Sequence, residues 1–207
     1  MKILNIKPED FTNYKKPSMF IGMGTCDFKC CIESNIPTET CQNHRLLEDY
    51  MELEPQTIVG NYMSNNISEA IVIGGLDPFN DFMNLLDLID EFRRNTLDDI
   101  VIYTGYYPYE IINYLLYLTN YDNIIIKFGR FIPNDTLHKD KVLGVELVSN
   151  NQYAVKLNKD VHDVLKALKE NDGYCPCMLG KNDNTKCCCK GFQKQKSGEC
   201  HCGIFSK

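Results

Sequence analysis

The chain has 207 residues, a formal net charge of −6 and a pI of about 5.2. Hydrophobic residues make up 43% of it and its mean hydropathy is −0.30, values typical of a globular protein with an apolar core. The acidic balance argues against a nucleic-acid or membrane-surface binder, because such proteins carry a basic patch. The first residues lack the apolar core of a secretory signal, and no apolar run is long enough to span a membrane, so we expect a cytoplasmic protein.

Two kinds of apolar pattern alternate along most of the chain. Continuous apolar runs that end near glycine predict buried parallel strands over 18–24, 70–73, 100–103 and 123–127. Apolar residues at helical spacing predict helices over 56–62, 82–92, 110–118 and 161–168. The alternation predicts an α/β fold with a mostly parallel sheet. Ligands of such sheets bind at the carboxyl ends of the strands, which is the edge where these glycines fall.

The eleven cysteines form two groups, with none between Cys41 and Cys175. A disulfide framework usually spreads its cysteines through a short secreted chain, so this grouping favours metal or redox sites. The first group is Cys26, Cys30, Cys31 and Cys41, and the second is Cys175, Cys177, Cys187, Cys188, Cys189, Cys200 and Cys202. The segment that carries the second group has little apolar material. A metal centre must therefore supply much of its folding energy.

The first group contains the spacings Cys26-x3-Cys30, in a loop that leaves a predicted strand, and Cys41-x-Asn43. Three thiolates hold three irons of a [4Fe–4S] cluster and leave the fourth iron open to a ligand. Soft thiolates favour such a cluster over magnesium or calcium. Taken alone, these cysteines are equally compatible with a zinc site or with unrelated thiols.

Four further segments follow in order along the chain. They are Gly74-Gly75-Leu76-Asp77-Pro78, Ile102-Tyr103-Thr104-Gly105-Tyr106, Lys127-Phe128-Gly129-Arg130-Phe131 and Ser149-Asn150-Asn151-Gln152. Each alone has an ordinary structural interpretation, such as a strand-to-helix turn. With the first cysteine group, however, they make residues 1–157 resemble the radical S-adenosylmethionine (radical SAM) superfamily, specifically the activases of anaerobic ribonucleotide reductase. The chain departs from that family at Lys127, where the family has an acid.

This resemblance implies a partial (β/α) barrel of the small radical SAM type. It implies Cys26, Cys30 and Cys41 as cluster ligands, with Cys31 spare. The contacts that it implies with S-adenosylmethionine come from Asn43, Gly74, Gly75, Asp77, Tyr103 and Thr104. An electron from a donor such as ferredoxin or flavodoxin would cleave the cofactor to methionine and a 5′-deoxyadenosyl radical, which removes hydrogen from a glycine of the reductase large subunit.

The second group is arranged as three C-x-C pairs. Structural zinc prefers a wider knuckle spacing, so zinc is disfavoured. Residues 158–207 instead resemble the catalytic subunit of ferredoxin:thioredoxin reductase, with Cys188 standing where that family has proline. The resemblance implies a second [4Fe–4S] cluster on Cys175, Cys187, Cys189 and Cys200. It also implies a redox-active pair, Cys177 and Cys202, with His201 either assisting proton transfer or serving only as a linker.

The combined prediction is an oxidoreductase of two domains, 1–157 and 158–207, the second a small helical and loop iron–sulfur domain. The first would activate anaerobic ribonucleotide reductase, and the second would reduce a disulfide of that reductase or of a thioredoxin-like protein. One alternative keeps the radical SAM chemistry and changes the substrate to another protein or a small molecule. The other is a non-catalytic two-cluster electron carrier or redox sensor.

Overall fold

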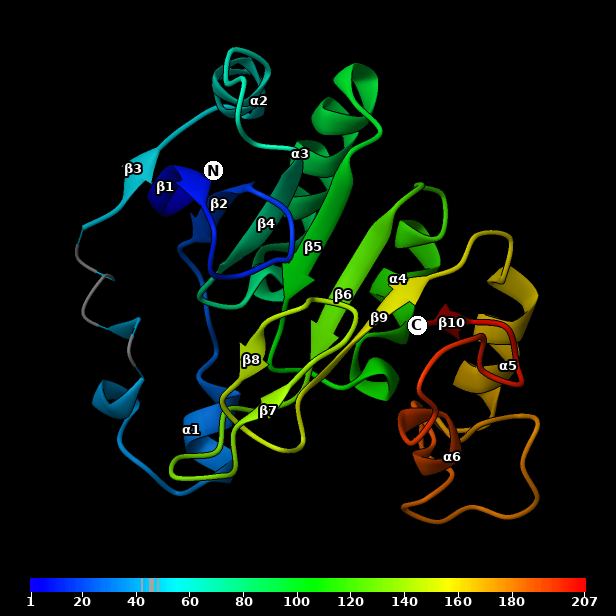
Figure 1. Ribbon diagram of the computed structural model, residues 1–207. Helices are drawn as coiled ribbons and strands as arrows, with labels where there is room; N and C mark the ends of the chain where they lie inside the picture. Colours follow the sequence, from blue (N-terminus) through cyan, green and yellow to red (C-terminus); the bar gives the residue numbers. More distant parts are fainter. Residues whose placement is uncertain (42, 45–46, 48) are drawn as a thin grey trace.

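The computed structural model describes residues 1–41, 43–44, 47 and 49–207. Its main element is an eight-stranded sheet in the order β10-β9-β6-β5-β4-β2-β1-β3 (Figure 1). The strands are β1 (Lys2–Asp10), β2 (Ser18–Met23), β3 (Met51–Glu52), β4 (Ala70–Gly75), β5 (Asp99–Tyr103), β6 (Ile124–Phe128), β9 (Tyr153–Leu157) and β10 (Phe205–Ser206). The α/β class predicted from the sequence is confirmed.

The four predicted strands are β2, β4, β5 and β6, and they pair in parallel at the centre of the sheet. The edges are antiparallel, because β1 pairs with β2 and β3 on one side, and β9 pairs with β6 and β10 on the other. The sheet is therefore mixed rather than mostly parallel. Within the described residues the sheet stays open, and the partial (β/α) barrel stays a prediction.

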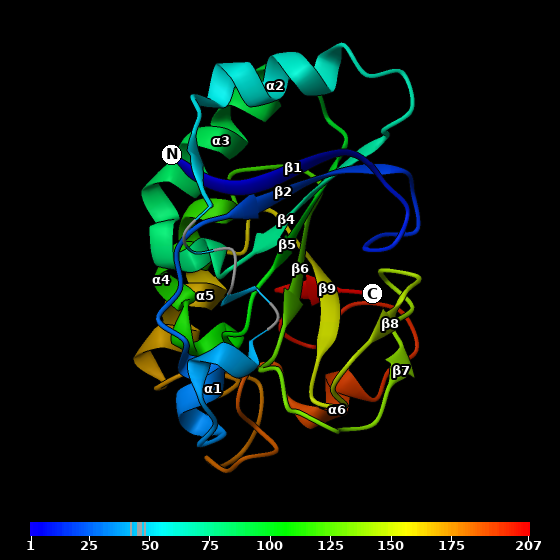
Figure 2. The ribbon, with the colours of Figure 1, turned by 90° about the vertical axis from the view of Figure 1, so that its left-hand side faces the viewer.

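Both faces of the central strands are buried, which explains their continuous apolar sequences. In β4, Ile71 and Ile73 point to one core, while Ala70 and Val72 point to the other. The first core lies under α2 (Pro55–Met63), α3 (Phe82–Asn95), α4 (Ile112–Leu118) and α5 (His162–Glu170), which confirm the four predicted helices. Figure 2 shows these helices on one side of the sheet and the hairpin of β7 (His138–Lys139) and β8 (Glu146–Leu147) on the other.

The cysteine-rich tail packs against this sheet. Its last strand, β10, pairs with β9, and Phe205 lies 5.9 Å from Phe128 between ring centroids. Cys187, Cys188 and Cys200 belong to the same buried core as the central strands. Besides α5, the tail contains one short helix, α6 (Lys190–Gln193). The predicted boundary between two domains at residue 157 stays a prediction.

No helix among the described residues is long and apolar enough to cross a bilayer.

Candidate metal centre

A cavity of about 530 Å³ opens at the carboxyl ends of the four parallel strands. Residues of the first cysteine group and of the predicted cofactor contacts line it together. They are Cys26, Cys30, Cys31, Cys41, Asn43, Gly74, Gly75, Asp77, Tyr103 and Thr104. The fold therefore brings every predicted site residue of the first region to one place. The physical reason is that strands running in parallel present their carboxyl ends at a common edge.

Three short segments carry the cysteines of this cavity. Cys26 lies in the loop after β2, and its Sγ accepts a hydrogen bond from the backbone N–H of Phe28 at 3.2 Å. Cys30 and Cys31 lie on α1 (Lys29–Glu33), and Cys41 follows the 3-10 helix η1 (Thr38–Thr40). Burial raises the pKa of Cys26 to about 12 and raises the pKa values of Cys30 and Cys31. Metal binding would reverse this effect, because thiols lose their protons on coordination.

Two glycines make room for this arrangement. Gly75 has a φ of 84°, and a Cβ atom there would stand 2.8 Å from the Cα of Gly22 on the neighbouring strand. Its carbonyl oxygen accepts a hydrogen bond from Nδ2 of Asn43, which draws the segment after Cys41 toward β4. A Cβ atom at Gly105 would stand 2.6 Å from the Sγ of Cys30. The position of the Cys30 thiol therefore depends on a glycine at the end of β5.

Asp77 is buried where the chain leaves β4, and its carboxylate is engaged within the protein. It accepts hydrogen bonds from Oγ1 of Thr104 at 2.9 Å, from the N–H of Gly105 at 2.9 Å and from the N–H of Phe79 at 3.2 Å. Burial raises its pKa to about 6 despite these hydrogen bonds. Asp77 thus ties the loop after β4 to the loop after β5. Its predicted contact with a cofactor stays a prediction.

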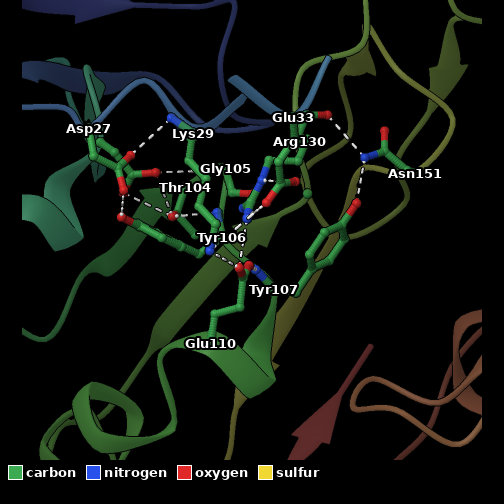
Figure 3. Close-up of polar contacts among 12 residues, drawn as sticks. Asp27, Lys29, Glu33, Thr104, Gly105, Tyr106, Tyr107, Glu110, Arg130 and Asn151 are labelled. Atoms are coloured by element: carbon green, nitrogen blue, oxygen red, sulfur yellow. Dashed lines mark hydrogen bonds and ion pairs between the residues drawn. The ribbon is translucent and has the colours of Figure 1, made fainter. Parts of the chain in front are cut away.

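A group of ion pairs around the buried Arg130 holds α1 against the segments that follow β5 and β6 (Figure 3). Arg130 donates to Glu33 on α1 at 2.9 Å and to Glu110 at 2.7 Å, and it also donates to the carbonyl oxygen of Gly105. Lys29, also on α1, bonds to the same Glu110. Burial opposes the charge on Arg130, but the hydrogen bonds to the two carboxylates raise its pKa overall. These ion pairs fix the position of α1, the helix that carries Cys30.

The tail brings most of its thiols together but leaves one outside. The Sγ of Cys202 lies 3.6 Å from that of Cys200 and 3.9 Å from that of Cys175. The hydrogen bond with Cys202 lowers the pKa of Cys200, and the N–H of Phe205 also donates to Cys200 at 3.2 Å. Cys177 is exposed.

The other predicted tail residues divide between the interior and the surface. Cys187 is buried with Cys188, Cys189 is half-buried and His201 is exposed. The redox pair predicted from the sequence, Cys177 with Cys202, stays a prediction. In the structure Cys202 contacts Cys200 and Cys175, which are two of the predicted cluster ligands. All eleven cysteines are free thiols.

A single-ion site has no support in the described residues. No group of three or more His, Cys, Asp or Glu side chains there could hold one metal ion. A [4Fe–4S] cluster makes a different demand, because each thiolate binds its own iron and the ligands stand farther apart. Four cysteines around one cavity fit that demand better than they fit zinc, whose four ligands converge on one ion.

A family model described as a 4Fe-4S single cluster domain matches residues 18–155, well over half of the 207-residue chain. The chain belongs to this iron–sulfur family. A search of curated proteins gives no match, and a search of solved structures gives none. The match contains the first cysteine group and the whole cavity edge of the parallel strands, so the predicted iron–sulfur character of this region is confirmed at the level of a 4Fe-4S domain. The domain is compatible with an oxidoreductase.

The sequence alone does not show that Glu33 and Glu110 pair with Arg130. Glu33 and Glu110 gave no signal by themselves, because they are ordinary acids in predicted loop and helix regions. Arg130 lay in a quoted motif, but its partner Glu33 is 97 positions away. The resemblance implies that Cys31 is spare, whereas the structure places it in the cavity wall beside Cys30. The choice of Cys41 as third ligand therefore stays a prediction.

Proposed function

We propose that this 4Fe-4S protein cleaves S-adenosylmethionine reductively and transfers the radical to a protein glycine. The observation that carries the proposal is the cavity itself, where a cysteine set, a glycine-rich strand end and the Tyr103–Gly105 segment meet. When bound, a reduced [4Fe–4S] cluster supplies the electron that breaks the carbon–sulfur bond, leaving methionine and a 5′-deoxyadenosyl radical. Cys26, Cys30 and either Cys41 or Cys31 would hold it, and an external donor of the ferredoxin or flavodoxin class would restore the electron.

The remaining cavity residues would bind the ligand and exclude water from it. The backbone of Gly74 and Gly75 lines the cavity at the end of β4. Both glycines are needed for close packing within the sheet, because a Cβ at Gly74 would meet Phe20 at 3.2 Å and one at Gly75 would stand 2.8 Å from the Cα of Gly22. Leu147, in β8, and Val148, which follows it, also line the cavity. These apolar side chains would keep water from a radical formed there.

The protein proposed to receive the radical is the large subunit of anaerobic ribonucleotide reductase, because the first cysteine group and the four later segments resemble its activases in the same order along the chain. Mixing the reduced, cofactor-supplied protein with that subunit should give the electron paramagnetic resonance signal of a glycyl radical. If S-adenosylmethionine is cleaved but the signal stays absent, the radical goes to another protein or a small molecule.

The tail is proposed to reduce a disulfide on the same reductase or on a thioredoxin-like protein. Cys177 is exposed, as the attacking thiol of a protein disulfide must be, and Cys202 is half-buried among other thiols. The thiolate of Cys177 would attack the target disulfide and form a mixed disulfide. Cys202 would then displace the second target thiol, leaving two reduced target thiols and a Cys177–Cys202 disulfide. Cys175, Cys187, Cys189 and Cys200 would hold a cluster that, when bound, could pass two electrons from an external donor to that disulfide, one at a time.

The experiment for the cavity is anaerobic. The protein is loaded with iron and sulfide, reduced, and given S-adenosylmethionine, and 5′-deoxyadenosine is measured. Cys26→Ala and Cys30→Ala should abolish product, and the pair Cys31→Ala and Cys41→Ala should identify the third ligand. Cys188→Ala, in the tail, is the matched control and should keep product formation. A parent protein with an intact cluster spectrum but no product would overturn the proposal in favour of the electron-carrier alternative.

The tail has its own assay, in which free thiols on an oxidised thioredoxin-like protein are counted after incubation with the reduced chain. Cys177→Ser and Cys202→Ser should each stop the reduction, while Cys31→Ser should not. Full activity in Cys177→Ser would contradict the role of Cys177 as the attacking thiol.

A further inference from the structure

Tyr153 joins the sheet that carries the cavity to the cysteine-rich tail. It is the first residue of β9, which lies between β6 and β10 in the sheet (Figure 1). Its neighbour Gln152 lines the cavity, and Tyr153 itself pairs with Phe128 at the end of β6. The Tyr153 side chain belongs to the same buried core as Cys187 and Cys188. A residue of the first predicted domain therefore reaches the cysteines of the second.

The hydroxyl group of Tyr153 lacks a partner. The residue is 9% exposed, and its hydroxyl oxygen is buried without a hydrogen bond to any described residue. A buried tyrosine hydroxyl usually finds a partner, because it has given up its hydrogen bonds to water. Among the described residues the other two buried tyrosines follow this rule, since Tyr14 donates to Asp99 at 3.0 Å and Tyr62 to Asp98 at 2.6 Å. The unbonded hydroxyl therefore needs a specific reason.

The groups beside this hydroxyl are the thiols of Cys188 and Cys187. Burial, together with these two thiols, raises the pKa of Tyr153 well above its ordinary value, so the hydroxyl keeps its proton and stays a hydrogen-bond donor. A neutral thiol is only a weak acceptor. A thiolate bound to iron carries negative charge, and a hydrogen bond to a charged acceptor is shorter and stronger. The missing partner therefore arises when the neighbouring cysteines bind a metal.

The two thiols belong to the larger group of sulfur atoms in the tail. A hydrogen bond with Cys188, burial, and the thiols of Cys202 and Cys200 all raise the pKa of Cys187. The Sγ of Cys175 lies 3.9 Å from that of Cys202. Burial opposes the loss of a proton from such thiols unless a metal binds them. Soft thiolates grouped in this way suit an iron–sulfur cluster.

We propose that Tyr153 is a positioning residue of the tail metal centre, and that its hydroxyl donates a hydrogen bond to the iron-bound thiolate of the Cys187–Cys188 pair. The inference rests on the tail cluster of the proposed function and adds to it a residue from outside the tail. A hydrogen bond to a cluster sulfur favours the reduced cluster, because reduction adds negative charge. Tyr153 should therefore raise the reduction potential of the tail cluster and help it to retain iron.

The test uses the full chain carrying Cys26→Ala and Cys30→Ala, so that the tail cluster is observed without the cavity cluster. After anaerobic loading with iron and sulfide, the midpoint potential and the iron affinity in competition with a chelator are measured with and without Tyr153→Phe. The variant should have a lower midpoint potential and bind iron roughly 10-fold to 100-fold more weakly. Tyr62→Phe, which removes a buried hydroxyl from α2, is the matched control and should leave both values unchanged.

A second measurement needs no iron. In the iron-free chain Tyr153→Phe removes an unbonded hydroxyl, so the denaturant concentration at half-unfolding should stay equal or rise. Tyr62→Phe breaks a hydrogen bond to Asp98 and should lower that concentration. The proposal thus predicts that the Tyr153 hydroxyl helps the protein only when iron is bound, whereas a purely structural role predicts that it helps in both states.

Each other result overturns a defined statement. An unchanged midpoint potential in Tyr153→Phe, with an intact cluster spectrum, means that the hydroxyl does not bond to a cluster sulfur. A loss of stability in iron-free Tyr153→Phe means that the hydroxyl is already bonded there, which contradicts the inference even if the loaded variant cannot be prepared. If the chain with Cys26→Ala and Cys30→Ala takes up no iron, the tail cluster of the proposed function fails and the inference fails with it, a result distinct from the first two.

Discussion

The contact between Gly105 and Cys30 gives the sharpest test of the cavity as a metal centre. Gly105 has no left-handed backbone conformation, so alanine meets no backbone strain there. Its Cβ would, however, stand 2.6 Å from the Cys30 Sγ, against 3.4–4 Å for ordinary contact. The thiol or the loop must therefore move by about 1 Å. Overpacking of this kind costs about 1–3 kcal/mol of unfolding free energy.

The assay measures iron per chain and cluster absorbance after anaerobic reconstitution, together with denaturant unfolding. Gly105→Ala should bind less iron than the parent, because a cluster ligand is displaced. The matched control is Gly60→Ala in α2, where an added Cβ meets nothing within 4 Å. That variant should load iron normally and gain about 0.5–1 kcal/mol from the better helix former.

Parent-like iron loading and spectrum in Gly105→Ala would refute the reasoning. It would mean either that Cys30 is not a ligand or that α1 adjusts freely. The second explanation conflicts with the ion pairs that hold α1 through Arg130. Unfolding data separate the two, because free adjustment predicts no loss of stability.

Three other perturbations follow from the described contacts. Arg130→Met should lower the unfolding free energy by about 1–3 kcal/mol, since it removes the buried guanidinium that bonds to Glu33 and Glu110 and leaves Glu110 paired only with Lys29. Glu33→Gln, on a half-exposed partner, should cost under about 1 kcal/mol in the same denaturant titration. Asp10 has a pKa of about 2, because hydrogen bonds from Lys7, Asn13 and Thr12 outweigh the effect of burial. The stability that it contributes should be complete above pH 3.8 and disappear as pH falls toward 2, so Asp10→Asn should cost about 1–2 kcal/mol at pH 7 and little at pH 2 in urea unfolding. Iron chelation should destabilise the tail more than the sheet, seen as faster proteolysis between Cys175 and Cys202, and equal protection with and without iron would contradict a tail cluster.

The central strands were predictable because their signal is local. Runs such as Ala70–Ile73 are apolar at every position, and that pattern is typical of strands covered on both faces. The antiparallel strands toward the edges of the sheet carry no such local signal. In β1 the sequence Lys2–Asp10 mixes charged and apolar residues, and it contains a proline beyond the two residues that pair with β3. Strand β10 has two residues, too few for any periodicity.

The sequence by itself determined the α/β class and the four parallel strands, because helical and strand periodicity is visible among neighbouring residues. It also determined the residue types of an iron–sulfur site, because thiolates are preferred ligands of iron in such clusters. Only the tertiary structure decided which distant residues meet. The pairing of Arg130 with Glu33, the closeness of Cys202 to Cys200 and Cys175, and the burial of Lys127 in the cavity depend on how strands and loops pack. No local sequence pattern predicts such contacts, because the free energy that fixes them comes from burial and charge pairing between distant residues.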